Sequence, residues 1–276
     1  MTDMKTADTP LISVIMGVFY RKEDTALLER SVWSILEQTY GNFEFLICDD
    51  GSSREAADVL NRFAEQDERI KLVRGIQRTD LAAKLNACLR LAKGAYIARM
   101  DDDDWSEPQR FEKQIRALYE RPKIAFIGSN VLLCRNDQVC GERVFPELPQ
   151  VKDFYVTQPF IHPALMFRKE ALVRVDGYSE NKGQVLCEDY DLLLRLYAVG
   201  YRGMNLQENL LKYSVSVTAK GNRKMRHRWN EAVTRYARFH DLGLLPLAWP
   251  FVLKPLVVGL LPSWLLAKIK CRSERK

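Results

Sequence analysis

The chain has 276 residues, of which 47% are hydrophobic and 28% are charged, and its formal net charge at pH 7 is +6. This is ordinary globular composition, and the length allows one large α/β domain or one domain with an appendage. The cysteines are scattered and form no Cys-x-x-Cys pair, which excludes a zinc ribbon and a disulfide framework. We expect reduced thiols in a cytosolic setting at Cys48, Cys88, Cys134, Cys140, Cys187 and Cys271.

Strand and helix alternate through the first hundred residues. Apolar runs rich in β-branched and aromatic residues predict strands at residues 11–18, 43–48, 70–73 and 96–100. Apolar residues at helical spacing predict the intervening helices at residues 24–38, 54–65 and 81–92. This alternation predicts an α/β fold of Rossmann-like type, with a mostly parallel sheet and helices on both faces.

The alternation becomes less regular after Trp105. We expect a helix, a strand, a hairpin arm, a further strand and a helix, in that order, at residues 109–120, 124–128, 139–145, 162–167 and 188–199. No internal repeat and no low-complexity linker interrupts this region. We therefore predict one domain that extends over residues 1–225.

A basic and apolar segment, residues 226–276, follows the predicted domain. Residues 242–269 are almost wholly apolar, but four prolines and Lys254 interrupt them, which argues against one clean membrane span. One interpretation is a hydrophobic helical hairpin that packs on the domain. The other, which we favour, is a segment that lies in or dips into an anionic membrane surface, anchored by Trp249 and Trp264.

The charge distribution supports the membrane interpretation. The basic groups at residues 220–228 and 268–276 carry +5 and +4, which leaves −3 of the total charge of +6 for the rest of the chain. Clustered Lys and Arg beside an apolar segment favour anionic cytoplasmic lipids. The polar residues 1–10 lack the order of a signal peptide. We therefore expect the protein at the cytoplasmic face of the inner (plasma) membrane, peripheral or monotopic.

Four consecutive aspartates, Asp101 to Asp104, end the predicted strand at residues 96–100. Acidic clusters are most often solvated loops. Here, however, the cluster occupies a strand-to-helix turn, which is where ligands bind in open α/β sheets. Hard divalent cations take carboxylate oxygens and commonly hold substrate phosphates as well. The cluster therefore predicts a divalent cation site.

Aromatic and acidic residues follow two other predicted strands. Phe19 comes after the first strand, and Asp49 and Asp50 precede a Gly-Ser turn after the second. Parallel strands bring these ends to one edge of the sheet, beside the acidic cluster. An aromatic ring can stack on a base, Asp49 can accept from a base N–H, and a cation can neutralise a diphosphate leaving group. The pattern predicts a site for a nucleotide diphosphate.

Several stretches together resemble the family 2 inverting glycosyltransferases of GT-A fold. They are residues 10–16, 34–40, 43–53 and 96–104, together with Arg110. The likeness extends over about residues 10–215, and its motifs are specific in combination although each is weak alone. It implies a GT-A fold, that is, a Rossmann-like sheet flanked by helices, with the apolar segment as a C-terminal membrane-associating appendage.

The resemblance also implies roles for individual residues. It implies that Asp49 binds the base and that Phe19 stacks on it, within a nucleotide-sugar site of Phe19, Asp49, Asp50, Asp101 and Asp102. It implies Mn²⁺ or Mg²⁺ bound by Asp103 and by Asp101, with Asp101 nearer the ribose and Asp102 facing away from the metal. Family members often have Gly-Leu before the third helix, where this chain has Asp80 and Leu81, so a backbone contact to phosphate is not expected there.

The pair Glu188 and Asp189 resembles the family's Glu-Asp motif, whose Asp is the general base. A base is needed because an acceptor hydroxyl is a poor nucleophile until its proton is removed. The alternative, which is compatible with the first, is that the pair only stabilises a helix N-terminus. Residues 160–163 resemble a stretch that borders the acceptor, which assigns His162 and Glu188 to the acceptor side. A lone histidine is more often structural.

The roles of three basic residues remain open in the sequence. Arg99, Arg110 and Lys84 are candidates for phosphate contacts, with salt bridges as the alternative. The function implied by the resemblance is inverting, metal-dependent transfer from a nucleotide sugar, with UDP preferred, to a saccharide acceptor. We expect that acceptor to be lipid-linked, in bacterial surface polysaccharide synthesis, with no nucleic-acid partner.

Two other functions remain open at this point. A nucleotidyltransferase also places paired carboxylates on a metal, but residues 17–22 are a poor version of the Gly-rich, basic loop that it needs. A non-catalytic scaffold that binds nucleic acid through residues 220–228 is disfavoured, because the basic residues lack aromatic interleaving.

Overall fold

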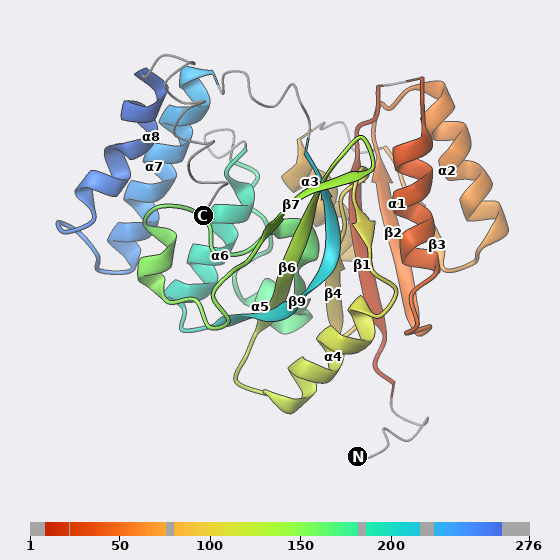
Figure 1. Ribbon diagram of the computed structural model, residues 1–276, viewed down its shortest axis with the longest axis horizontal. Coiled ribbons are helices and arrows are strands. Elements are labelled where there is room, and N and C mark those ends of the chain that lie inside the picture. Colours follow the sequence, from red (N-terminus) through yellow and green to blue (C-terminus); the bar gives the residue numbers. More distant parts are fainter. Residues whose placement is uncertain (1–8, 22, 76–79, 182–185, 216–223, 261–276) are drawn as a thin grey trace.

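The structure, a computed structural model, describes residues 9–21, 23–75, 80–181, 186–215 and 224–260. Parallel strands form the first half of its central sheet, as predicted. They are β1 (Ile12–Val18), β2 (Phe43–Asp49), β3 (Ile70–Val73) and β4 (Tyr96–Arg99). Nearly all residues of β1, β2 and β4 are buried, because helices cover both faces of the sheet (Figure 1).

Alternate residues of β1 face two different hydrophobic cores. Val14 and Met16 pack toward one face, which is covered by α1 (Ala26–Leu36), α2 (Arg54–Gln66) and α4 (Arg110–Glu120). Ile15 packs toward the other, which is covered by α3 (Leu81–Leu91), α5 (Lys169–Arg174) and α6 (Glu188–Ala198). This layering fixes the carboxyl ends of β1, β2 and β4 at one edge of the sheet.

The second half of the sheet is mixed, so the prediction of a mostly parallel sheet is wrong there. The strand order is β3-β2-β1-β4-β8-β6-β9-β5, with β7 paired to β6. β6 and β9 pair in parallel, whereas β8 pairs antiparallel to both β4 and β6, β5 to β9, and β7 to β6. The bounds are β5 (Trp105–Ser106), β6 (Phe126–Arg135), β7 (Gln138–Arg143), β8 (Met166–Arg168) and β9 (Gly203–Ser214).

A short connection explains the antiparallel pair of β6 and β7. β6 and β7 are joined through Asn136 and Asp137, both at positive φ (47° and 62°). Two such residues form the turn that matches the twist of a hairpin, whereas parallel neighbours need a crossover of about a dozen residues. The predicted hairpin arm is confirmed as β7. The predicted strand at 162–167 is wrong in its first half, because His162–Ala164 form a 3₁₀ turn around Pro163, which has no N–H to donate to a sheet.

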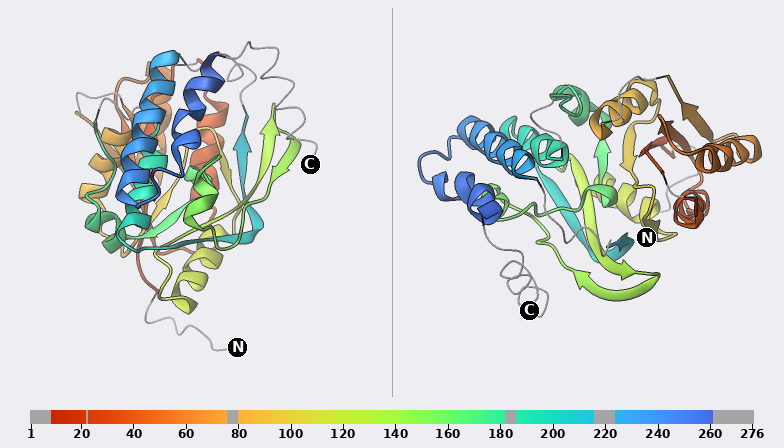
Figure 2. Two further views of the ribbon diagram at one scale, coloured as in Figure 1. Left: turned by 90° about the vertical axis from the view of Figure 1, so that its left-hand side faces the viewer. Right: turned by 90° about the horizontal axis from the view of Figure 1, so that it is seen from above.

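The C-terminal part of the described chain is helical. α7 (Met225–Asp241) packs on α6, where the buried carboxylate of Asp191 accepts from Arg195 at 2.6 Å and pairs with Arg238 at 3.0 Å. α8 (Trp249–Leu260) runs beside α7, and Phe251 stacks on Tyr155 with ring centroids 4.7 Å apart. Figure 2 shows α7 and α8 side by side, at the end of the molecule opposite α1 and α2.

Two sequence predictions, one on membrane-spanning helices and one on the cysteines, concern residues of which only a part is described. None of the helices in the described ranges combines the length and apolarity needed to cross a bilayer. The cysteines of the described ranges are free thiols, as expected: Cys48, Cys88, Cys134, Cys140 and Cys187. Residues 261–276, with Trp264 and Cys271, and the basic residues Lys220 and Arg223 lie outside the described residues.

We predict that Gly203→Ala destabilises the fold. Gly203 starts β9 opposite Phe126, and a Cβ there would lie 2.2 Å from Cε2 of Phe126 and 2.7 Å from Cζ of Phe160. Forcing a methyl group into this packed core is expected to lower the free energy of unfolding by about 1–3 kcal/mol. Urea denaturation measures the change. Gly41→Ala is the matched control, because no heavy atom lies within 4 Å of its Cβ position; equal effects at both glycines would contradict the packing argument.

Candidate active site

The four aspartates after β4 are held by three separate segments. The carbonyl of Asp101 accepts from the Ser31 hydroxyl of α1 at 2.6 Å, and its carboxylate pairs with the buried guanidinium of Arg99. The carbonyl of Asp103 accepts from the hydroxyl of Ser214, at the end of β9. The cluster is therefore a fixed turn on which distant parts of the chain converge, and not a solvated loop.

Two carboxyl groups of the cluster point into the protein. Asp104 is fully buried and accepts the backbone N–H of Ser214 at 2.8 Å, and burial, then Asp101 and Asp103, raises its pKa well above the usual range. Asp102 accepts the backbone N–H of Phe19, and burial, then the same two neighbours, raises its pKa to about 7. Asp102 and Asp104 thus tie the β1–α1 loop and β9 to the cluster. No pattern in the sequence indicated this role of Asp104.

Asp101 and Asp103 are the carboxylates that fit a divalent cation. Both are half-buried, as is Asp102, which accepts from Phe19, whereas Asp104 is enclosed. Burial, then the charges of Asp101 and Asp103, raises the pKa values of Asp102 and Asp104, and a cation at Asp101 and Asp103 would offset the second of these causes. Within the described ranges, no group of three or more His, Cys, Asp or Glu residues has the arrangement of a metal cage. The fit is therefore of the kind in which one or two carboxylates share the cation with substrate phosphates.

A second cluster lies at the end of β2. Asp49 ends this strand with 7% of its surface exposed, and its Oδ1 is buried without a hydrogen-bond partner among the described residues. Phe19 is 45% exposed, with the Arg21 guanidinium 4.6 Å from its ring centroid. Oδ1 of Asp49 could accept a hydrogen bond from the edge of a nucleobase, and the exposed ring of Phe19 could stack on its face.

Lys84 connects the two clusters. Its ammonium group is buried, donates to the carbonyl of Val18 and lies 4.8 Å from the centroid of Phe19. Burial lowers the pKa of Lys84, and the nearby carboxylates Asp49, Asp50 and Asp102 oppose that shift. Its charge therefore acts on the ends of both β2 and β4, which places Asp50 in the same electrostatic environment. Asp80 caps α3, accepting the N–H of Ala83 at 3.0 Å.

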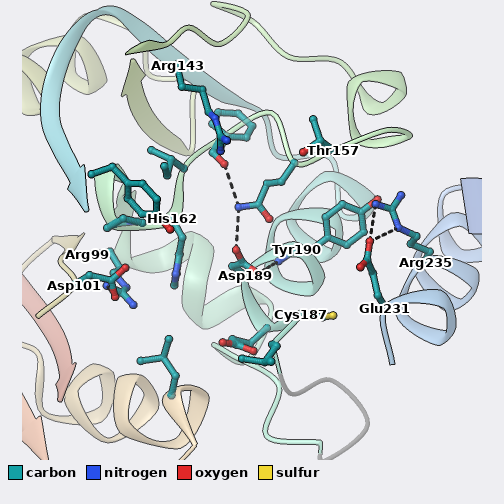
Figure 3. Close-up of a pocket in the computed structure, with 18 of the residues that line it drawn as sticks. Arg99, Asp101, Arg143, Thr157, His162, Cys187, Asp189, Tyr190, Glu231 and Arg235 are labelled. Carbon is teal, nitrogen blue, oxygen red and sulfur yellow. Dashed lines mark hydrogen bonds and ion pairs between the residues drawn. The ribbon is translucent and has the colours of Figure 1, made fainter. Parts of the chain in front are cut away.

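A cavity of about 390 Å³ adjoins the acidic cluster. Arg99 and Asp101 line one side of it and Asp189 lies across from them, with His162 between in the view of Figure 3. Glu188 is also part of the lining, whereas Phe19, Asp49, Asp50, Asp102 and Asp103 are not. The structure therefore brings the predicted base, the acceptor-side residues and one acidic-cluster residue to one cavity, with the predicted base-binding residues in an adjoining cluster.

Asp189 lies in the first turn of α6, where a negative charge is favoured by the helix dipole. Its Oδ2 accepts from Nε2 of Gln158 at 3.1 Å, and its Oδ1 accepts the N–H of Tyr190 at 2.8 Å. Gln158 in turn donates to the carbonyl of Phe160 at 3.2 Å, which fixes the amide (Figure 3). Helix capping and a catalytic role are compatible, because the same contacts that stabilise Asp189 also orient it toward the cavity.

His162 is a neutral, anchored residue of the cavity wall. It is 7% exposed, its Nε2 lies 2.9 Å from the hydroxyl of Tyr178, and burial, then the charge of Arg99, lowers its pKa well below the usual range. Arg110 is structural, since its buried guanidinium donates to the Arg99 carbonyl at 2.7 Å and it does not line the cavity.

The far wall of the cavity comes from α7, which sequence reasoning did not connect to the site. Arg235 is buried, pairs with Glu231 at 3.0 Å and donates to the carbonyl of Tyr155 at 2.8 Å. Its guanidinium also lies 4.7 Å from the ring centroid of Tyr190, next to Asp189 in α6. Arg235 and Glu231 are separated by one helical turn, a spacing that also describes any surface ion pair, so the sequence held no specific signal.

The comparisons with known proteins agree with this geometry. Residues 13–175 match the family described as Glycosyl transferase family 2. The chain is 35% identical over 255 residues to EpsE of Bacillus subtilis, which is named as a glycosyltransferase, with 92% of this chain and 91% of that protein covered. It is also 35% identical over 211 residues to the O-antigen biosynthesis glycosyltransferase WbnJ of Escherichia coli, with 74% and 80% covered.

A solved structure shows the same fold. The mannosyltransferase PcManGT from Pyrobaculum calidifontis, in complex with GDP-Man and Mn²⁺, matches with a TM-score of 0.61 at 19% identity, over 98% of this chain and 82% of that one. At this identity the likeness is one of architecture. It supports the GT-A type of fold for the mixed sheet and its helices.

We predict a pH dependence of stability that Glu188 causes. Burial, then the neighbouring Asp189, raises the pKa of Glu188 to about 7 from its ordinary value of 4.5. Between these values the folded state keeps a proton that the unfolded state has lost, so the free energy of unfolding falls as pH rises through this window. Glu188→Gln is expected to remove about 2 kcal/mol of that fall between pH 5 and pH 8, as measured by urea denaturation.

The exposed Glu68→Gln serves as the control for this series. Contributions from other groups are common to all the proteins and cancel in the comparison. If the curves for wild type and Glu188→Gln run parallel across the window, Glu188 does not hold a proton in the folded protein.

Proposed function

The chain belongs to glycosyl transferase family 2, and from that premise we propose that it transfers a sugar from a nucleotide sugar to a saccharide hydroxyl, with inversion at the anomeric carbon. Membership of this family makes the chain a glycosyltransferase and so decides against the non-catalytic scaffold and the nucleotidyltransferase. The observation that carries the proposal is the position of Asp189 across one cavity from Asp101.

The donor site is proposed from Asp49 and Phe19. The free Oδ1 of Asp49 is a single buried acceptor, and the imide N–H of uracil is a single donor. A UDP sugar is the donor that we propose, because the imide N–H of uracil can donate to this oxygen while the uracil ring lies against Phe19, which is half exposed.

Asp101 and Asp103 are the residues that we propose to hold the divalent cation, Mn²⁺ or Mg²⁺. A cation bound there would neutralise the diphosphate of the donor and stabilise it as a leaving group. The protein supplies further positive charge close by. The buried Arg99 pairs with Asp101, and the charge of Lys84 reaches Asp49, Asp50 and Asp102.

Asp189 is the proposed general base. It takes the proton of the acceptor hydroxyl as that oxygen bonds to the anomeric carbon, while the bond from this carbon to the diphosphate oxygen breaks. A single displacement of this kind inverts the anomeric centre and releases the nucleoside diphosphate. Gln158 holds one carboxylate oxygen of Asp189, and burial keeps His162, in the same cavity, neutral.

The acceptor is proposed to be a lipid-linked saccharide in bacterial surface polysaccharide synthesis. The name of the relative WbnJ places that protein in O-antigen biosynthesis. The basic, apolar sequence of residues 226–276 suits a site at the cytoplasmic face of the plasma membrane. On this proposal residues 1–225 form the catalytic domain and the remainder associates with the membrane, although Glu231 and Arg235 also reach the cavity.

We predict that Asp189→Asn abolishes turnover without weakening donor binding. Loss of a general base is expected to lower kcat about 10²–10⁴-fold. Release of the nucleoside diphosphate measures turnover, and calorimetric titration with a UDP sugar and Mn²⁺ measures binding. Asp58→Asn, on the exposed face of α2, is the control. Wild-type turnover by Asp189→Asn would remove Asp189 from the mechanism.

Asp49→Asn is predicted to have the opposite effect. Loss of the charged acceptor is expected to weaken donor binding by about 10- to 150-fold, since such hydrogen bonds contribute about 1.5–3 kcal/mol. The value of kcat at saturating donor is expected to stay near wild type. A panel of UDP, GDP and dTDP sugars identifies the base. Binding of GDP sugars alone would refute the uracil assignment, and binding of no nucleotide sugar in the presence of metal would refute the proposed function.

A further inference from the structure

Two apolar stripes run along the exposed sides of α7 and α8. On α7 the stripe is Met225, Trp229, Val233 and Tyr236, and on α8 it is Trp249, Leu253, Val257 and Leu260; each of these side chains is between 43% and 76% exposed. The spacing is the same on both helices, with steps of four, four and three residues, which keeps each set on one side of its helix. Large apolar side chains are thus gathered here and not scattered singly.

Contacts at both ends join the stripes into one surface, which we call the α7–α8 face. At one end, the rings of Tyr236 and Trp249 lie 5.5 Å apart. At the other, a Cβ on Gly259 would lie 2.8 Å from Cδ of Arg228 and 3.2 Å from Cε of Met225. The helices are therefore antiparallel neighbours along their whole described length, and the two stripes lie side by side. A contiguous exposed apolar surface of this kind marks an interaction site.

The opposite sides of both helices are already committed to the protein. Ala232, Arg235 and Phe239 of α7 and Val252 and Pro255 of α8 are buried. Packing on the domain therefore accounts for one side of each helix, in agreement with the hairpin interpretation, and leaves the α7–α8 face uncovered by the described residues.

The charge around the α7–α8 face is positive. Within residues 224–260, six Lys and Arg residues stand against two acids, and both acids are already paired, Glu231 with Arg235 and Asp241 with Arg238. Lys224 and Arg226 are exposed at the end where α7 begins, next to Met225. An apolar surface with a basic border and two exposed tryptophans has the chemistry of the boundary between anionic headgroups and acyl chains.

We propose that the α7–α8 face docks on an anionic lipid surface and thereby presents the cavity to a membrane-held acceptor. This inference rests on the proposed function for the identity of the acceptor. The face adjoins the cavity, because Lys254 of α8 donates to the carbonyl of Val156, and Val156, Glu231 and Arg235 all line the cavity. A saccharide whose lipid stays in the bilayer can then reach Asp189 without leaving the membrane surface.

Flotation with vesicles tests the docking surface. The full chain is expected to float with vesicles of phosphatidylcholine mixed with phosphatidylglycerol, and only weakly with phosphatidylcholine alone. The triple variant Trp229→Ser, Leu253→Ser, Val257→Ser is expected to lower binding to the anionic vesicles about tenfold or more, because three apolar side chains no longer leave water. The matched control is Tyr119→Ser, Leu91→Ser, Val173→Ser, which removes equally exposed apolar groups elsewhere and should float like wild type.

The outcomes separate this inference from the proposed function. The triple variant should keep its thermal unfolding midpoint and its release of nucleoside diphosphate from a UDP sugar in solution. If the wild-type protein floats with anionic vesicles but releases no nucleoside diphosphate from any nucleotide sugar, the proposed function is overturned and the docking surface is not. Failure of wild type to float, or equal flotation of wild type and the triple variant, would overturn the docking surface.

The α7–α8 face has two alternative explanations, a second copy of the chain and lipid binding by residues 261–276. Both can be tested with the wild-type protein and its variants. Sedimentation that shows a wild-type dimer and a monomeric triple variant, without flotation of either, would make the face an interface between copies and overturn the proposal. A chain that ends at Leu260 tests residues 261–276. If that chain loses flotation while the triple variant keeps it, the tail and not the face binds lipid.

Discussion

The site depends on one buried cation placed among acids. Arg99 ends β4 with 1% of its surface exposed and pairs with Asp101, the first residue of the acidic cluster. Its charge also acts on Asp102, Asp104 and Glu188, and it opposes protonation of His162. A buried charge without partners would be costly, and so would four adjacent carboxylates. The positive charge of Arg99 and the negative charges of the acidic cluster stabilise one another. The end of β4, which carries both, lies between the proposed donor and acceptor sides.

The two halves of the sheet contribute different parts of this arrangement. The parallel half supplies the proposed donor side, because the ends of β1, β2 and β4 bring Phe19, Asp49 and the acidic cluster to one edge. The mixed half supplies the proposed acceptor side through the 3₁₀ turn at His162 and the start of α6. β9 joins the halves chemically, since Ser214 at its end binds the Asp103 and Asp104 groups of β4's turn.

Local patterns account for what the sequence could predict. The strands of the parallel half are continuous apolar runs, and their helices have apolar residues at regular spacing. Both patterns involve residues that are close together in the chain, so they can be recognised in a short stretch of sequence. The acidic cluster and Asp49 were predicted as site residues because each follows such a strand, whereas Asp189 was predicted through the resemblance to the family's Glu-Asp motif. By contrast, β5 is two residues long and β9 is half exposed, and their pairing joins residues more than one hundred positions apart. No local periodicity encodes that pairing.

The same reasoning explains which site residues were missed. Asp104, Gln158 and Arg235 contact residues far away in the chain, namely Ser214, Asp189 and Tyr155 respectively. Such contacts exist only after the mixed half has folded, and their residue types are common on any surface. Arg235 shows the consequence most clearly, because it joins a helix that carries an uncovered apolar face to the wall of the catalytic cavity. A helix that composition alone marks as an appendage is therefore built into the cavity wall, so that on our proposals the lipid-docking face and the acceptor side both include α7.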